Sequence, residues 1–188
     1  ALGISDIGES RDQEAKAKIA ELARAASAWQ VPALRWHFVG KLQTNKCRSI
    51  ARYADVVHSV DRVATASALA TGAQRAERTL AVFAQVSLDG DPARGGVLAE
   101  RLGALADLIA AAEPLRLRGV MAIAPLGMDP DDAFERLATI AAELRAQHPA
   151  ATDISAGMSS DLEAAIRHGA THVRVGTALL GRRGDVFG

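Results

Sequence analysis

Residues 119–155, GVMAIAPLGMDPDDAFERLATIAAELRAQHPAATDIS, contain the signal that decides the fold. Residues 119–124 form a short apolar run that is typical of a buried strand, and residues 152–155 are a second, shorter β-rich run. Asp129 is placed to cap a helix between them, with Pro130 in its first turn. One apolar stripe along that helix is predicted by residues that recur at steps of three and four, namely Phe134, Leu137, Ala141 and Leu144. This order predicts a parallel β/α unit.

The same alternation runs along the rest of the chain. Five more β-rich runs are found at residues 5–8, 36–39, 56–60, 81–86 and 172–175. Helical stretches are predicted at residues 11–29 and at residues 98–112, where leucines and Ile109 mark one face. Periodicity alone leaves a barrel and an open doubly wound sheet as alternatives. No linker or low-complexity tract divides the chain, so we expect one domain over residues 1–188.

Composition excludes several classes of protein. A chain of 188 residues with 49% hydrophobic residues can bury a core. Lys plus Arg and Asp plus Glu both total 22, so no net field recruits nucleic acid or an anionic membrane. No run reaches the roughly 18 apolar residues of a membrane helix. The first ten residues do not resemble a signal peptide, and Cys47 is a single cysteine. We expect a cytoplasmic protein and a monomer.

Two turns at the ends of the last predicted strands could bind phosphate. Residues 155–161, SAGMSSD, precede a helical run, and small residues there allow a ligand close to the backbone. An ordinary glycine turn with a serine cap is the alternative. The last strand ends with Arg174, followed by Gly176 and Thr177. In barrels the loops after strands seven and eight often form one phosphate site. Arg174 lies inside an apolar strand, where it either serves a ligand or forms a structural ion pair.

Several blocks resemble the family of pyridoxal phosphate homeostasis proteins, which is related in fold to the N-terminal barrel of alanine racemase. They are WHFVGKLQTNK (36–46), GESRDQEA (8–15), HSVDR (58–62), LRGVMAIAP (117–125) and SAGMSSDLEAAIRHGATHVRVGTALLGRR (155–183). The resemblance extends over nearly the whole chain. It implies a (β/α)8 barrel of the TIM type and pyridoxal 5′-phosphate as the cofactor.

The resemblance also implies roles for particular residues. Ser159 and the Met158 amide match the position that holds the cofactor phosphate, as do Gly176 and Thr177. Arg174 matches the arginine that faces the pyridine nitrogen. A permanent cation there keeps that nitrogen unprotonated, which makes the ring a poorer electron sink. The resemblance therefore implies storage and delivery of the cofactor rather than broad carbanion chemistry.

The Schiff-base lysine of the family, at the end of its first strand, has no match. The chain has only Lys16, Lys18, Lys41 and Lys46, and none fits that position. We therefore predict no catalytic residue in this chain. Seven strands are predicted where closure takes eight. We expect that the first β/α unit is missing, that the chain is incomplete at its N-terminus, and that residues 1–3 are the tail of its helix.

Other candidate residues carry less specific signals. His37 is expected to face the cofactor pocket, with a packed core histidine as the alternative, and His58 is expected in the core. Cys47 near a helix start is expected to be a plain, partly buried thiol rather than a reactive one. Arg94 is expected at the rim or on the surface, and Ser10 replaces the asparagine that is usual in the family. The histidines and Cys47 lack metal-ligand spacing, so no metal is predicted.

The sequence is compatible with three functions. The leading hypothesis is a non-catalytic protein that holds pyridoxal phosphate and delivers it, with apo-enzymes that use the cofactor as possible partners. The second is a racemase or decarboxylase of the alanine-racemase-like class. Racemases need a tyrosine from a second domain, and the one tyrosine here, Tyr53, lies far from the end of the chain. The third, an unrelated barrel enzyme that binds phosphate, leaves the WHFVGKLQTNK block unexplained.

Overall fold

Seven parallel strands form one curved sheet in the computed structural model, which describes residues 4–26 and 34–181. The strands are β1 (Asp6–Glu9), β2 (Arg35–Phe38), β3 (Val56–Val60), β4 (Leu80–Gln85), β5 (Leu115–Met121), β6 (Asp153–Met158) and β7 (His172–Arg174). Each strand pairs in parallel with the next one in the sequence. This order is that of a β/α barrel and excludes the doubly wound alternative, in which the strand order reverses.

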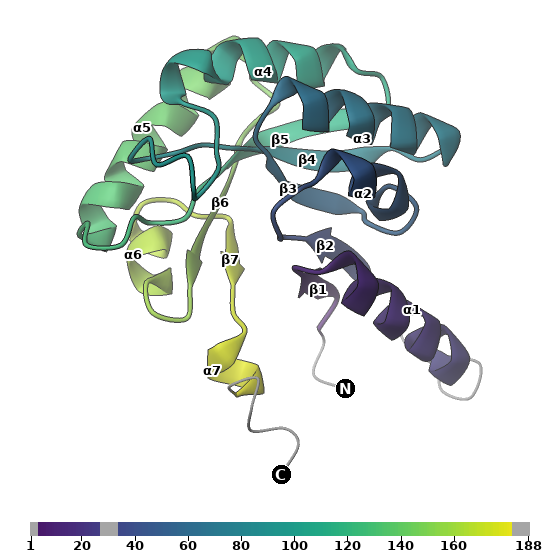
Figure 1. Cartoon of the computed structure of the whole chain (residues 1–188). Coiled ribbons are helices and arrows are strands. Elements are labelled where there is room, and N and C mark those ends of the chain that lie inside the picture. Colours follow the sequence, from purple (N-terminus) through teal and green to yellow (C-terminus); the bar gives the residue numbers. More distant parts are fainter. Residues whose placement is uncertain (1–3, 27–33, 182–188) are drawn as a thin grey trace.

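A helix follows each strand. The helices are α1 (Asp12–Ala26), α2 (Thr44–Ile50), α3 (Val63–Arg75), α4 (Ala99–Ala111), α5 (Pro130–Gln147), α6 (Leu162–Arg167) and α7 (Thr177–Leu180). Of these, α3, α4 and α5 lie along the outer side of the curved sheet, whereas α7 extends beyond the end of β7 (Figure 1). Figure 1 also shows β1 and β7 at the two ends of the curve, apart from each other. Within the described residues these two strands do not pair. The expected β/α barrel architecture is confirmed, with seven parallel strands that stay open between β1 and β7 in the described residues.

The two faces of the sheet bury different side chains because successive residues of a strand point to opposite sides. Toward the helices, Val57, Val82 and Val120 belong to one large apolar core. Their strand neighbours Val56, Phe83 and Met121 form a second, small apolar cluster on the inner face. The interior of the barrel is therefore only partly apolar, and buried polar groups complete it: His37, His58, Gln85 and Ser155.

Gly119 sets the close contact between β5 and β6. Its φ is 154°, and a Cβ atom at this position would lie 1.8 Å from the carbonyl oxygen of Asp153. Because that atom is backbone in a neighbouring strand, no rotamer change could relieve the overlap. Only glycine fits here, so the glycine of the LRGVMAIAP block is explained by strand packing.

Most of the predicted elements are found within a few residues of their expected bounds. The Oδ1 atom of Asp129 accepts a hydrogen bond from the Asp131 N–H at 2.8 Å, and α5 begins at Pro130, so the predicted helix start is confirmed. The strand predicted at 119–124 instead begins at Leu115, because its first half alternates between buried leucines and exposed arginines. Two predicted helical segments, residues 27–29 and residues 1–3, lie outside the described residues.

No helix of the described residues is long and apolar enough to cross a membrane.

Glu77, just beyond the C-cap of α3, has a φ of 53°, and no other described non-glycine residue has a positive φ. The N–H groups of Glu77 and Arg78 close the helix end by donating to the carbonyls of Gln74 and Ala73. This left-handed conformation strains an L residue, whereas glycine adopts it freely. We expect Glu77→Gly to raise the free energy of unfolding by about 0.5–1 kcal/mol in urea denaturation. Glu77→Ala, which keeps the Cβ atom, is the control; an equal gain there would show that backbone strain is not the cause.

Candidate functional site

A cavity of about 740 Å³ extends along the inner face of the sheet between its two end strands. Its wall is formed by β1 and β2 on one side and by β7 on the other, and the turns after β6 and β7 lie at its mouth. All six residues that the sequence assigned to cofactor binding line it: His37, Met158, Ser159, Arg174, Gly176 and Thr177. They come from three separate segments, so the structure brings together residues that are up to 140 positions apart (Thr177 minus His37). The volume lies in the range of small-molecule sites, roughly 300–1,000 Å³.

Arg174 is a partly buried cation held by neutral acceptors. Its Nη1 donates to the Ser155 carbonyl at 3.3 Å and to Ser155 Oγ at 3.0 Å, and its Nη2 donates to the Ala122 carbonyl at 3.1 Å. The ion pairs of the described residues do not include Arg174, so the alternative of a structural ion pair is not what the structure shows. Burial lowers the pKa of Arg174 from its usual value, and the Asp161 carboxylate partly opposes this. A positive charge that is partly removed from water and has only neutral partners favours an electron-rich ligand atom.

A row of hydrogen bonds crosses the barrel interior from Arg174. Ser155 Oγ lies 2.8 Å from His58 Nδ1, and His58 Nε2 lies 2.8 Å from His37 Nδ1. The other ring nitrogen of His37, Nε2, lies 2.8 Å from Asp6 Oδ1. We call these five residues the interior chain. Desolvation by burial, with the charges of His37 and Arg174, lowers the pKa of His58 to about 2, so its ring is neutral.

The two predicted phosphate turns meet at the mouth of the cavity. The backbone N–H of Ala178 donates to Ser159 Oγ at 3.4 Å, which ties the turn after β6 to the start of α7. Gly157 allows the first turn, since its φ is 89° and a Cβ atom at this position would lie only 2.7 Å from Ala165 Cβ. The Met158 N–H is already donated to Asp161 Oδ1 at 2.6 Å. Met158 therefore lines the cavity, but its amide is engaged by Asp161.

His37 and His58 are both buried, and both belong to the interior chain. His58 stacks on Phe83 with ring centroids 4.6 Å apart, which agrees with its expected place in the core. His172 is a third imidazole nearby, 6.0 Å from His58 by ring centroids, and burial lowers its pKa. The described residues contain no group of three or more His, Cys, Asp or Glu side chains that could hold a metal ion.

Arg94 is more than a rim residue. Its Nη2 donates to the carbonyls of Ala124 at 2.7 Å and Ile123 at 3.3 Å, and its Nε lies 3.7 Å from Asp89 Oδ2. Arg94 thereby fastens the loop after β4 to the segment after β5. Ser10, which replaces the family's asparagine, lines the cavity and is exposed.

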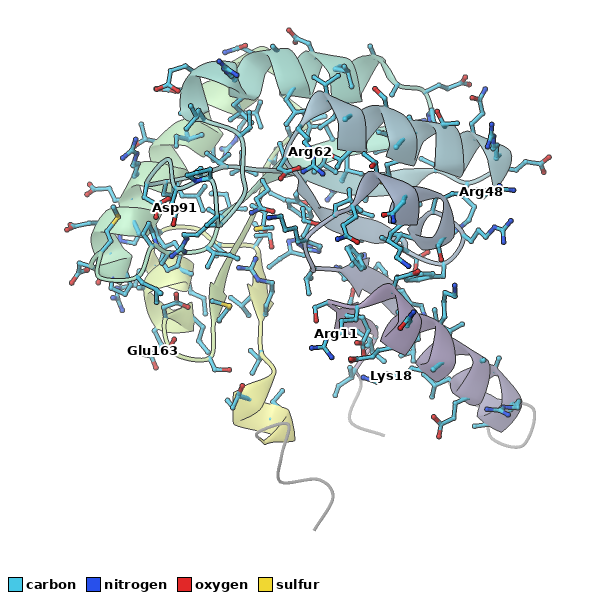
Figure 2. The ribbon with its side chains drawn as sticks, in the orientation of Figure 1. Arg11, Lys18, Arg48, Arg62, Asp91 and Glu163 are labelled. Atoms are coloured by element: carbon cyan, nitrogen blue, oxygen red, sulfur yellow. The ribbon has the colours of Figure 1, made fainter. Side chains whose placement is uncertain are left out.

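All four lysines belong to the described part of the chain, and none of them lines the cavity. Lys18 extends from α1 beside β1 (Figure 2), where its Nζ donates to Glu9 Oε1. Lys16, on the same helix, donates to Ser49 Oγ at 3.2 Å. Lys41 and Lys46 line a different hollow, of about 480 Å³, between the starts of α1 and α2.

Sequence reasoning missed three residues of the site. Asp6 and Ser155 complete the interior chain, and Arg35 lines the cavity beside Asp6, to which its Nε lies at 2.7 Å. Ser155 gave a weak signal, because it is a polar residue at the end of an apolar strand, in a block whose small residues point to phosphate. Asp6 gave none, because its partner His37 is 31 positions away.

Comparisons with known proteins agree with this geometry. The family described as "Alanine racemase, N-terminal domain" matches residues 1–184. The pyridoxal phosphate homeostasis protein of Mycobacterium tuberculosis (strain ATCC 25618 / H37Rv) is 49% identical over 194 residues, which cover 97% of this chain and 75% of that protein. The protein of the same name from Corynebacterium glutamicum is 43% identical over 189 residues, covering 97% of this chain and 81% of the relative.

Solved structures show the same fold. PipY, the COG0325 family member of Synechococcus elongatus PCC7942, with PLP bound, is 40% identical and superposes with a TM-score of 0.82 over 93% of this chain and 80% of PipY. Alanine racemase of Clostridium difficile 630 superposes with a TM-score of 0.70 over 95% of this chain and 45% of the racemase. At 14% identity, that second likeness concerns the fold alone.

Cys47 lies on α2 with its side chain fully buried, and burial raises the pKa of its thiol to about 11. Because the thiolate is the reactive form, we expect a disulfide reagent at pH 8 to react far more slowly with the folded protein than with the denatured chain. Absorbance of the released thiol measures this without interference, since Cys47 is the single cysteine. Native reaction as fast as that of a free thiol would contradict a plain buried cysteine.

Proposed function

Because this chain belongs to the alanine racemase N-terminal domain family, and within it to the pyridoxal phosphate homeostasis proteins, we propose that it binds pyridoxal 5′-phosphate and acts in the homeostasis of this cofactor. The protein holds the cofactor in the interior cavity and delivers it. The observation that carries the proposal is the partly buried guanidinium of Arg174, which lies in that cavity and has no carboxylate partner among the described ion pairs.

The residues present fit the cofactor. Ser159, Gly176 and Thr177 supply hydroxyls and small backbone turns at the mouth, where a phosphate suits the loops after the last two strands. Met158 adds to the same wall, and its N–H joins the phosphate contacts only when Asp161 releases it. His37 and Arg174 line the deeper part, where the ring of the cofactor belongs.

When bound, pyridoxal phosphate supplies an aldehyde carbon and a pyridine ring that can accept electron density. Arg174 opposes the second property. Its guanidinium is a fixed cation, so it disfavours a proton on the nearby ring nitrogen and leaves the ring a weak electron sink. Storage and delivery need a bound cofactor but no electron sink, and this is why we favour a binding protein over an enzyme.

The alternative is a racemase-like or decarboxylase-like enzyme that uses pyridoxal phosphate. The one tyrosine of the chain, Tyr53, packs against the outer apolar core, and it does not line the cavity within the described residues. A tyrosine acid of the racemase kind is therefore not supplied by this residue. Assays of amino-acid racemisation and decarboxylation, with the cofactor added, separate the two functions; turnover at ordinary enzymatic rates would favour the enzyme.

Further expectations belong to the same proposal. They are a single barrel domain over residues 1–188, a monomeric state, a cytoplasmic location and apo-enzymes as recipients of the cofactor. The continuous order of the seven strands supports the first of them. Sedimentation of the protein at several concentrations tests the second.

Ser159→Ala combined with Thr177→Val should weaken binding of pyridoxal phosphate at least about tenfold, because a hydrogen bond to a charged group contributes roughly 1.5–3 kcal/mol. Equilibrium dialysis or fluorescence titration measures the affinity. The matched control is Ser67→Ala with Thr71→Val, a pair on the exposed side of α3. Equal affinity of the site variant and the control would move the phosphate to another part of the protein.

Binding by this chain should be non-covalent, since no lysine lines the cavity. We expect borohydride reduction of the protein–cofactor mixture to leave Lys16, Lys18, Lys41 and Lys46 unmodified in peptide mass spectra. A stoichiometric adduct on Lys41 or Lys46 would show that the hollow between α1 and α2, rather than the interior cavity, takes the cofactor.

A further inference from the structure

The interior chain has a direction that follows from counting its hydrogens. Arg174 can only donate, so Ser155 Oγ accepts from it. If the single hydroxyl hydrogen of Ser155 is donated to His58 Nδ1, the proton of the neutral His58 ring must be on Nε2. That proton is donated to His37 Nδ1, which places the His37 proton on Nε2, facing the carboxylate of Asp6. Every contact then joins one donor to one acceptor.

The opposite direction requires one proton more. If His58 donated from Nδ1 to Ser155, its bare Nε2 would need a proton from His37 Nδ1. A neutral His37 would then turn an unprotonated Nε2 toward Asp6 Oδ1 at 2.8 Å, and two lone pairs would face each other. Hydrogen bonds from Ser5 and His37 lower the pKa of Asp6, so the carboxyl group does not supply the missing proton.

We propose that Asp6, His37, His58 and Ser155 are positioning residues that fix the guanidinium of Arg174 through a hydrogen-bond chain of one direction, from Arg174 to the carboxylate of Asp6. The proposal rests on the proposed function, because it gives the chain a role toward the bound cofactor. His58 holds the Ser155 hydrogen, so that the hydroxyl presents lone pairs to Arg174. The two backbone carbonyls of Ser155 and Ala122 then complete the cradle.

The position of the chain in the fold supports this role. It joins β1, β2, β3, β6 and β7, and its step from His58 to Ser155 links strands that are not neighbours in the sheet. Its middle members are almost fully inaccessible to water, with 1% exposure at His58 and 0% at Ser155. Water cannot replace a lost hydrogen-bond partner there, so the loss of one hydrogen bond alters the donor or acceptor role of the next residue.

The first experiment uses the cofactor-free protein, both unaltered and as the Ser155→Ala variant. Long-range nitrogen–proton correlation spectra of the ¹⁵N-labelled chain report which ring nitrogen of each histidine bears a proton. We expect protonated Nε2 and bare Nδ1 in both His37 and His58, and a changed Nδ1 signal of His58 in Ser155→Ala. His148 and His168, which do not belong to the interior chain, are the internal controls. A proton on Nδ1 of His58, or a mixture of tautomers, would overturn the directional chain.

The second experiment tests positioning. His58→Phe keeps a ring that can stack on Phe83 but removes both nitrogens, whereas His58→Gln keeps one acceptor and one donor. We expect His58→Phe to weaken binding of pyridoxal phosphate about three- to tenfold and to shift its absorption band, and we expect Arg174→Ala to shift the band in the same way. His58→Gln should recover part of both effects. Phe83→Leu disturbs the packing of His58 without touching a hydrogen bond, so it should lower the melting temperature and leave the absorption band in place.

The outcomes separate the two proposals. Unchanged affinity and absorption in His58→Phe would overturn the positioning role, even if the spectra show the expected tautomers. If His58→Phe does not fold, Ser155→Ala and Phe83→Leu give the same comparison, and an unshifted band in Ser155→Ala would be decisive against positioning. If the unaltered protein does not bind pyridoxal phosphate at all, the proposed function fails, while the tautomers of the cofactor-free protein still decide the direction of the chain.

Discussion

The guanidinium of Arg174 has to be satisfied inside a barrel without a carboxylate beside it, and much of the interior is arranged around that need. A charge removed from water is costly unless its hydrogens are taken up by acceptors. Here two backbone carbonyls and one hydroxyl accept them. The hydroxyl is itself fixed by a neutral imidazole, and the row ends at Asp6, a carboxylate near the rim. Arg174 thus has no carboxylate as a direct hydrogen-bond partner, which leaves the cation available to a ligand in the cavity.

This arrangement depends on a sheet with two different faces. The outer face is covered by helices and is almost wholly apolar, so it provides most of the hydrophobic stabilisation. The inner face carries only a small apolar cluster around Phe83, together with the polar groups of the chain. Barrel interiors are usually filled with branched apolar side chains. The exchange of apolar for polar groups in this interior is consistent with a binding site that extends deep between the strands.

At the mouth of the cavity, one hydrogen bond determines which backbone groups are free to bind a phosphate. Small residues after β6 and β7 create two adjoining turns, and Ser159 connects them through the Ala178 amide. The Met158 amide, however, is held by the Asp161 carboxylate, which also precedes α6 as its N-cap residue. Asp161 therefore competes with an incoming phosphate for the same donor. An acidic side chain at this position repels an anion until its own hydrogen bond is exchanged, and this suits a protein that releases its cofactor.

The sequence by itself determined the local structure and the family. Asp129 and Pro130 begin α5 where they were expected to, and short β-rich runs mark all seven strands, because caps and periodicity depend on neighbours within a few residues. It failed at the start of β5, where Arg116 and Arg118 alternate with leucines and conceal the strand. Only the tertiary structure decided which polar residues meet. Ser155 and His58 are 97 positions apart, and their contact depends on the curvature of the sheet, which brings β3 and β6 face to face across the interior. No local pattern encodes such a pairing, since each residue alone fits an ordinary buried strand.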